Sequence, residues 1–302
     1  MTLSEQGFTI QEVSKAYSLP ETTIRSYIKQ GFIVAEKKGK RYRVVDKRMP
    51  EIAEKIRDEK SNPASALGEG IGVLIEDTVK EALKELADAH GYDLKSGDIK
   101  NGFGNLHQID GIIAKDGKYT VLIEAKFLRY TKHNMDKGSR LIVAHHNIRR
   151  HYPTIRRCIA ILCGNWTEGS RQLIKSFNID SLEVSWKKIV NVFAGFGIDI
   201  EWEEDDTEKA RTAWKKFRRL SQADLNNIAE KVLADIKKPL LGLIEATIAA
   251  DPMREKNITG IELALQTSHN EFFVSQFKKA GDVIAYLMRF QTDVSDVGKI
   301  LQ

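Results

Sequence analysis

The alternation of apolar and polar residues predicts two helices and a hairpin at the start of the chain. Residues 10–17 and 21–31 each place apolar side chains at helical spacing, and Pro20 between them suits the first turn of a new helix. Residues 32–45 then alternate apolar and polar around a Lys-Gly turn, which is typical of a two-stranded hairpin. We expect these elements to form a first domain over residues 1–60.

The middle of the chain alternates helical and strand patterns. In order, the pattern predicts a helix over 70–90, a hairpin over 106–128, a helix over 138–151, a strand over 158–163, a helix over 167–177 and a strand over 181–185. This order predicts an α/β fold with a mixed sheet flanked by helices, in a second domain over residues 64–204.

Two changes of composition separate these parts. Residues 58–70 are rich in Ser, Gly, Pro and charge, and residues 201–208 carry six acids in eight positions, so we expect linkers at both places. A third, mostly helical region over residues 205–302 follows, which either mediates dimerisation or completes the second domain. Within it, residues 261–266 and 272–277 fit a strand or a helix equally well.

The distribution of charge along the chain predicts a polyanionic partner. The net charge is only +5, but nine Lys and Arg against two acids lie between Arg25 and Arg48. A second cluster, from Lys126 to Arg157, holds nine against one, with four His besides. Clusters of this size favour nucleic acid as the partner, and we expect the helix at 145–151 to lie along a phosphate backbone. The chain lacks a visible signal sequence or membrane span, so we expect a cytoplasmic protein without a membrane partner.

Three residues of the hairpin at 106–128 do not suit a core element. Asp110 interrupts the first apolar run, and Glu124 and Lys126 interrupt the second, on one face of the strand. Two carboxylates and an ammonium can therefore converge on the sheet. Carboxylate oxygens are ligands for Mg²⁺, and a neighbouring Lys can orient a water or balance charge on phosphate, so the set suits metal-assisted phosphodiester hydrolysis. The simpler alternative is a turn cap and an exposed ion pair.

A fourth misfit lies on the preceding helix. Glu76 falls within the apolar stripe that contains Ile75, Val79 and Leu83, where a carboxylate needs a partner or a metal. Glu76 is therefore a candidate third acidic group, and Glu69 is the fallback.

The N-terminal stretch "FTIQEVSKAYSLPETTIRSYIKQGFI" resembles the winged helix–turn–helix of MerR-type proteins. The resemblance covers about 45 residues and implies that the second helix faces the major groove while basic residues of the wing contact phosphate. The DNA-binding residues it implies are Thr22, Thr23, Arg25, Ser26 and Lys29 on the helix and Lys38, Lys40, Arg41 and Arg43 on the wing. A basic, solvated face on a small interaction domain is the alternative.

Asp110, followed after thirteen residues by Glu124-Ala125-Lys126, resembles the PD-(D/E)XK nuclease motif, with Ile109 where the family often has Pro. The order of elements in residues 70–190 is also similar to that family's αβββαβ core. The resemblance implies a restriction-endonuclease-like fold and a Mg²⁺ cofactor bound by Asp110 and Glu124. It further implies that Lys126 orients the nucleophile, with assistance from Glu76.

These resemblances predict a Mg²⁺-dependent endonuclease for double-stranded DNA, most consistent with a prokaryotic type II restriction enzyme. Cutting both strands requires two sites, which favours a homodimer, and a cognate methyltransferase would be encoded nearby. The alternatives are a modification-dependent (Mrr-like) or recombination nuclease and, from a different class, a MerR-like regulator without enzymatic activity.

Overall fold

The computed structural model describes residues 7–17, 19–39, 41–53, 62–249, 257–266 and 271–289. The chain divides into two compact units, Met1–Thr247 and Ile248–Gln302. Residues 205–247 therefore belong to the first unit. Within the described residues, no helix is long and apolar enough to cross a membrane.

The N-terminal elements lie close to their predicted positions. They are β1 (Phe8–Thr9), α1 (Ile10–Tyr17), α2 (Glu21–Lys29), β2 (Ala35–Lys38) and β3 (Arg41–Val44). The three strands form an antiparallel sheet in the order β1-β3-β2. Buried apolar side chains of both helices, including Val13 and Ile24, pack with Val44 of the sheet. Two short helices are thus held together by one small core, because neither could bury its apolar face alone.

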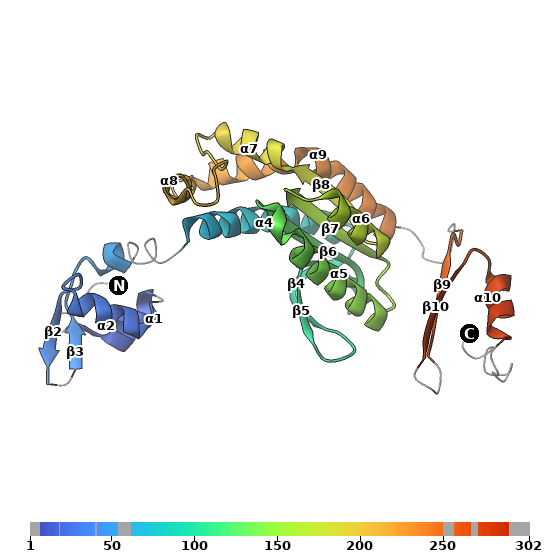
Figure 1. Ribbon diagram of the computed structural model, residues 1–302, viewed down its shortest axis with the longest axis horizontal. Helices are drawn as coiled ribbons and strands as arrows, with labels where there is room; N and C mark the ends of the chain where they lie inside the picture. Colours follow the sequence, from blue (N-terminus) through green and yellow to red (C-terminus); the bar gives the residue numbers. More distant parts are fainter. Residues whose placement is uncertain are drawn as a thin grey trace. The chain divides into compact units, whose positions relative to one another are not determined.

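A five-stranded mixed sheet forms the centre of the chain (Figure 1). Its strands are β4 (Asp93–Lys100), β5 (Leu106–Lys115), β6 (Lys118–Leu128), β7 (Arg157–Gly164) and β8 (Asp180–Ser185). They lie in sequence order; β4, β5 and β6 are antiparallel neighbours, whereas β7 runs parallel to both β6 and β8. This confirms a mixed α/β sheet flanked by helices.

Helices cover both faces of this sheet (Figure 1). Helices α5 (Asn134–His151) and α6 (Glu168–Ser176) lie on one face, and α4 (Pro63–Ala89) and α7 (Trp186–Ala194) on the other. Helices α8 (Thr207–Phe217) and α9 (Gln222–Ile248) pack against α4 and α7. The region after residue 204 therefore begins by completing this unit.

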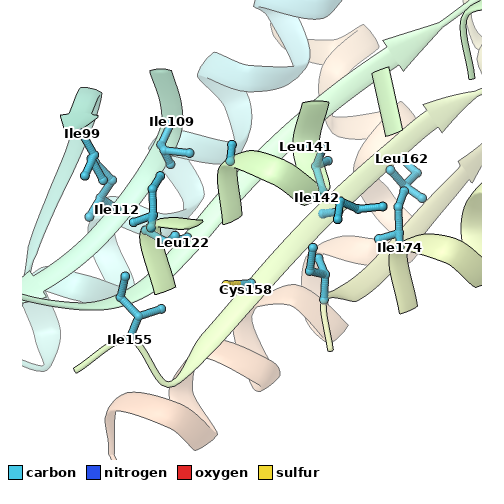
Figure 2. Packing of buried hydrophobic residues seen from close by; sticks show 14 of the residues in the cluster. Ile99, Ile109, Ile112, Leu122, Leu141, Ile142, Ile155, Cys158, Leu162 and Ile174 are labelled. Atoms are coloured by element: carbon cyan, nitrogen blue, oxygen red, sulfur yellow. The ribbon is translucent and has the colours of Figure 1, made fainter. Parts of the chain in front are cut away.

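The densest core lies between the sheet and α5 with α6. Leu122 of β6 and Cys158 of β7 belong to one buried cluster with Leu141 and Ile142 of α5, and Figure 2 labels all four. Leu122 has the same strand parity as Glu124 and Lys126, so these polar residues extend the row of side chains that faces α5. Both Cys158 and Cys163 are buried free thiols.

Both expected linkers belong to folded structure where they are described. Helix α4 begins at Pro63, because Asn62 Oδ1 accepts hydrogen bonds from the backbone N of Ala64 (3.0 Å) and Ser65 (3.3 Å). In the acidic run, the Arg129 guanidinium lies 3.5 Å from the centre of the Trp202 ring. Residues 201–208 are thus tied to the sheet and do not separate two domains.

The second unit pairs two strands beside a helix. It contains β9 (Ile261–Gln266) and β10 (Phe272–Phe277), which pair as antiparallel strands, followed by α10 (Ala280–Leu287). The two segments that fitted strand or helix equally well are therefore strands.

Gly164, at the end of β7, has no room for a side chain. Its φ is +103°, and an added Cβ would lie 2.0 Å from the Leu128 carbonyl oxygen. We expect Gly164→Ala to lower the free energy of unfolding by about 3 kcal/mol, since both the backbone angle and the clash oppose it. Urea unfolding followed by tryptophan fluorescence measures this loss. Gly169→Ala is the control, because Gly169 lies in α6 with nothing within 4 Å, and it should be neutral or stabilising by up to about 1 kcal/mol. Equal effects of the two substitutions would contradict the prediction.

Candidate active site

Asp110 lies where strands β5 and β6 stop pairing. The last register pair is Gly111 with Ile123, and beyond it Asp110 Oδ2 accepts a hydrogen bond from the backbone N of Ala125 at 2.9 Å. The carboxylate thus satisfies an amide that the partner strand no longer reaches. This bond fixes the carboxylate beside the strand that carries Glu124 and Lys126.

Lys126 joins the two carboxylates. Its Nζ lies 2.9 Å from Glu124 Oε1 and 3.2 Å from Asp110 Oδ2. Burial disfavours the ammonium, but the charges of Glu124 and Asp110 outweigh it, and the pKa of Lys126 is raised above its usual value. The side chains of Glu124 and Lys126 are 7% and 25% exposed, so only the ammonium end of this row reaches solvent. The convergence expected from the strand pattern is present.

Glu76 lies within electrostatic reach of this group. It sits on α4, half-buried, and its pKa is raised by burial and then by the negative charge of Asp110. It makes no hydrogen bond or ion pair with any residue that the structure describes. Glu69, the fallback, is exposed and lines a separate cleft with Trp214. The structure therefore brings Glu76, and not Glu69, to the site.

His145 is a member of the site that the sequence did not indicate. It is fully buried on α5, and its Nε2 lies 3.1 Å from Glu124 Oε2. We expected residues 145–151 to lie along a phosphate backbone, and for His145 this is wrong, because it has no exposed surface. The spacing contains a signal, since His145 lies four residues after Leu141 and three before Ile148, both buried.

The Glu124–His145 contact is a buried ion pair. Burial lowers the pKa of His145, but the Cys158 sulfur and the Glu124 carboxylate raise it further, to about 9. Burial raises the pKa of Glu124, whereas His145 and Lys126 lower it more, so the pKa lies below its usual value. Both groups are therefore charged near neutral pH, and each oxygen of Glu124 faces one cation.

The donor atoms at the site suit a hard cation. Among the described residues there is no group of three or more His, Cys, Asp or Glu positioned to hold a metal ion. Mg²⁺, however, usually takes only one or two protein carboxylates and keeps several waters. Asp110 and Glu124 could supply these oxygens, with Glu76 nearby.

The N-terminal candidates are exposed in part. Thr22, Arg25 and Lys29 are exposed on α2 and Ser26 is half-buried, whereas Thr23 is only 4% exposed. Thr23 was expected among the DNA contacts, and its burial is a correction: the helix turns this position toward the small core. Arg25 forms an exposed ion pair with Glu21 at 3.4 Å.

The remaining candidate DNA contacts lie on and around the hairpin formed by β2 and β3. Arg43 donates a hydrogen bond to the carbonyl oxygen of Gly7 at 3.1 Å, so its guanidinium has a structural partner. Lys38 and Arg41 are placed on β2 and β3 by their backbone, and Lys40 lies outside the described residues.

Comparisons with known proteins add little. No protein-family model and no curated protein matches the chain. Among solved structures, the chain is similar to the crystal structure of a protein of unknown function, AF1548, at 16% sequence identity and a TM-score of 0.26. The match covers 56% of this chain and 98% of that chain. A likeness at this TM-score carries no argument about fold or activity.

Proposed function

We propose that the protein is a Mg²⁺-dependent endonuclease that cleaves double-stranded DNA, as a type II restriction enzyme does. One observation carries this proposal: the Lys126 ammonium bridges Asp110 and Glu124 where β5 and β6 diverge. A plain structural ion pair has no need of a second carboxylate at the same ammonium, nor of Glu76 close by. The order α4-β4-β5-β6-α5-β7 also supports the proposal, because it agrees with the αβββαβ core of PD-(D/E)XK nucleases.

Each residue has a role in the proposed hydrolysis. Asp110 and Glu124 would hold Mg²⁺, which supplies a Lewis acid and lowers the pKa of a bound water. Lys126 orients the attacking water and balances the negative charge that develops on phosphate. Glu76, with its raised pKa, is suited to accept the proton of that water. The water oxygen bonds to phosphorus, and the bond to the 3′ oxygen breaks. The departing 3′ oxygen takes a proton from solvent water, which leaves a 5′-phosphate and a 3′-hydroxyl.

DNA binding is proposed for the N-terminal elements. The exposed residues Thr22, Arg25 and Lys29 of α2, with the basic hairpin β2–β3, would contact DNA as in MerR-type winged helices. A homodimer would bring one site to each strand of the duplex.

A cleavage assay tests the proposal. We expect the wild-type protein to cut plasmid DNA with Mg²⁺ and not with EDTA, and Asp110→Asn to be inactive. This variant keeps an oxygen that can accept the Ala125 amide but removes the charge. Both unmethylated and methylated plasmids are used. Discrete fragments from unmethylated plasmid support restriction, cleavage of methylated DNA alone supports the modification-dependent alternative, and failure to cut either refutes the nuclease.

A further inference from the structure

The loop between β4 and β5 presents an aromatic side chain to solvent. Phe103 is 86% exposed, the largest exposed fraction among the described large apolar residues. Leu106, where β5 begins, is 58% exposed and extends the apolar tip. Figure 1 shows β4 and β5 running together to this loop beside the end of α5.

The loop is held in one conformation. Asn101 is 3% exposed, and its Oδ1 accepts hydrogen bonds from the backbone N of Phe103 (2.9 Å) and of Asn105 (3.0 Å). Its Nδ2 lies 3.0 Å from His107 Nε2, which anchors the loop to β5. Gly104 adopts a φ of +81° that closes the turn. Phe103 therefore projects from a preorganised support and needs little ordering on binding.

Two cationic residues lie near this loop. Lys100 ends β4 opposite Leu106 and is exposed, and Arg150 is exposed in the last turn of α5. Neither forms an ion pair within the part of the chain that the structure describes. The loop touches that helical turn, because a Cβ on Gly102 would lie 3.1 Å from His151 Nδ1. An exposed aromatic side chain in a loop that adjoins unpaired cations suits a ligand with stacked rings and phosphates, and nucleic acid is such a ligand.

Phe103 and Asp110 are close enough to contact one DNA duplex. Phe103 precedes Asp110 by seven residues of one hairpin, a span of at most about 23 Å. At 3.4 Å per base pair this corresponds to about seven base pairs. A duplex held at Asp110 can therefore also reach the loop.

We propose that the loop at residues 101–105 is a DNA wedge: Phe103 inserts between base pairs of the duplex bound at the active site, while Lys100 and Arg150 contact the flanking phosphates. This inference rests on the proposed function, because it takes double-stranded DNA as the substrate. Insertion unstacks one base step and unwinds and kinks the duplex there. The kink would lie within about seven base pairs of the phosphate to be cleaved.

A linking-number assay tests the wedge without knowledge of the recognition sequence. Relaxed closed plasmid is incubated with the protein in EDTA, treated with a metal-independent type I topoisomerase, and deproteinised. We expect the wild-type protein to lower the linking number in proportion to bound protein. Phe103→Ala should abolish this change and weaken plasmid binding about tenfold, whereas Phe103→Trp should retain both. Phe272→Ala, at a Phe that is 56% exposed on β10, is the matched control and should behave as wild type.

Each result separates the wedge from the nuclease. If the wild-type protein binds and cuts plasmid but leaves the linking number unchanged, or if Phe103→Ala lowers it equally, the wedge is refuted and the nuclease stands. If the wild-type protein neither binds nor cuts DNA, the proposed function fails, and the wedge with it. Sedimentation of wild type and Phe103→Ala provides a further check, because loss of a dimer in the variant would assign the tip to self-association and refute the wedge.

Discussion

Lys126→Met should reduce DNA cleavage by about 10²- to 10³-fold, the range found when one preorganised electrostatic group is removed from an active site. Methionine keeps the length of the side chain but not the ammonium that bridges Asp110 and Glu124. Without it the two carboxylates repel each other, and no fixed cation remains to orient the water or to balance charge on phosphate. Initial rates of plasmid cleavage at saturating Mg²⁺ measure the effect.

A control and a graded variant make this result specific. Lys118→Met places the same substitution at an exposed position where β6 begins, and it should leave the rate unchanged. Lys126→Arg keeps the charge but replaces a compact ammonium by a planar guanidinium, so we expect a rate between those of wild type and Lys126→Met. Plasmid binding in Ca²⁺ and thermal unfolding confirm that the variants are folded. Cleavage by Lys126→Met within about threefold of wild type would exclude the assigned role.

His145→Leu should lower the free energy of unfolding by about 3–5 kcal/mol, the cost of removing one partner of a buried ion pair. The substitution leaves the buried Oε2 of Glu124 without the cation that lies 3.1 Å away. His145→Gln can still donate a hydrogen bond from a comparable position, so we expect it to retain part of this stability. Denaturant unfolding of the three proteins at pH 6 measures both differences.

The pH dependence of stability distinguishes this pair from simple packing. The folded-state pKa of His145, about 9, lies above its ordinary value of 6.5, so the stabilisation is complete below pH 6.5 and is lost as the pH rises through 9. The free energy of unfolding of the wild-type protein should therefore fall by on the order of 3 kcal/mol between pH 6.5 and 9. His145→Gln has no group that titrates there and should not show this loss. Parallel stability profiles of the two proteins would show that the imidazolium is absent.

The sequence predicted the elements whose apolar pattern is strong. Strands β5, β6 and β7 are continuous or alternating apolar runs, and all three are present at the expected positions. Strand β4 was not assigned, because an edge strand with the sequence "DLKSGDIK" is mostly polar on both faces. The start of α4 was taken as a linker from its composition, although Asn62 followed by Pro63 is a helix-start signal. The capping residues were thus a better predictor of the start of this helix than the composition of the segment.

The candidate site was predictable only within the hairpin. Strand alternation alone places Glu124 beside Lys126, and Asp110 follows from the partner strand. The contribution of His145 depends on how α5 lies over β6, which no local pattern specifies. The packing of α8 against α4, and the ion pair of Lys188 with Asp235 on α9, likewise join residues that lie far apart in the sequence. The place of His145 in the site and the extent of the first unit therefore depend on packing between residues that are far apart in the sequence.

Asp110 serves two purposes with one side chain, since its Oδ2 terminates the strand pairing at Ala125 and also holds Lys126. Folding requires an acceptor at this position, whereas the proposed hydrolysis requires a negative charge. A gene copy released from the second constraint but not from the first would therefore drift toward Asn rather than Ala.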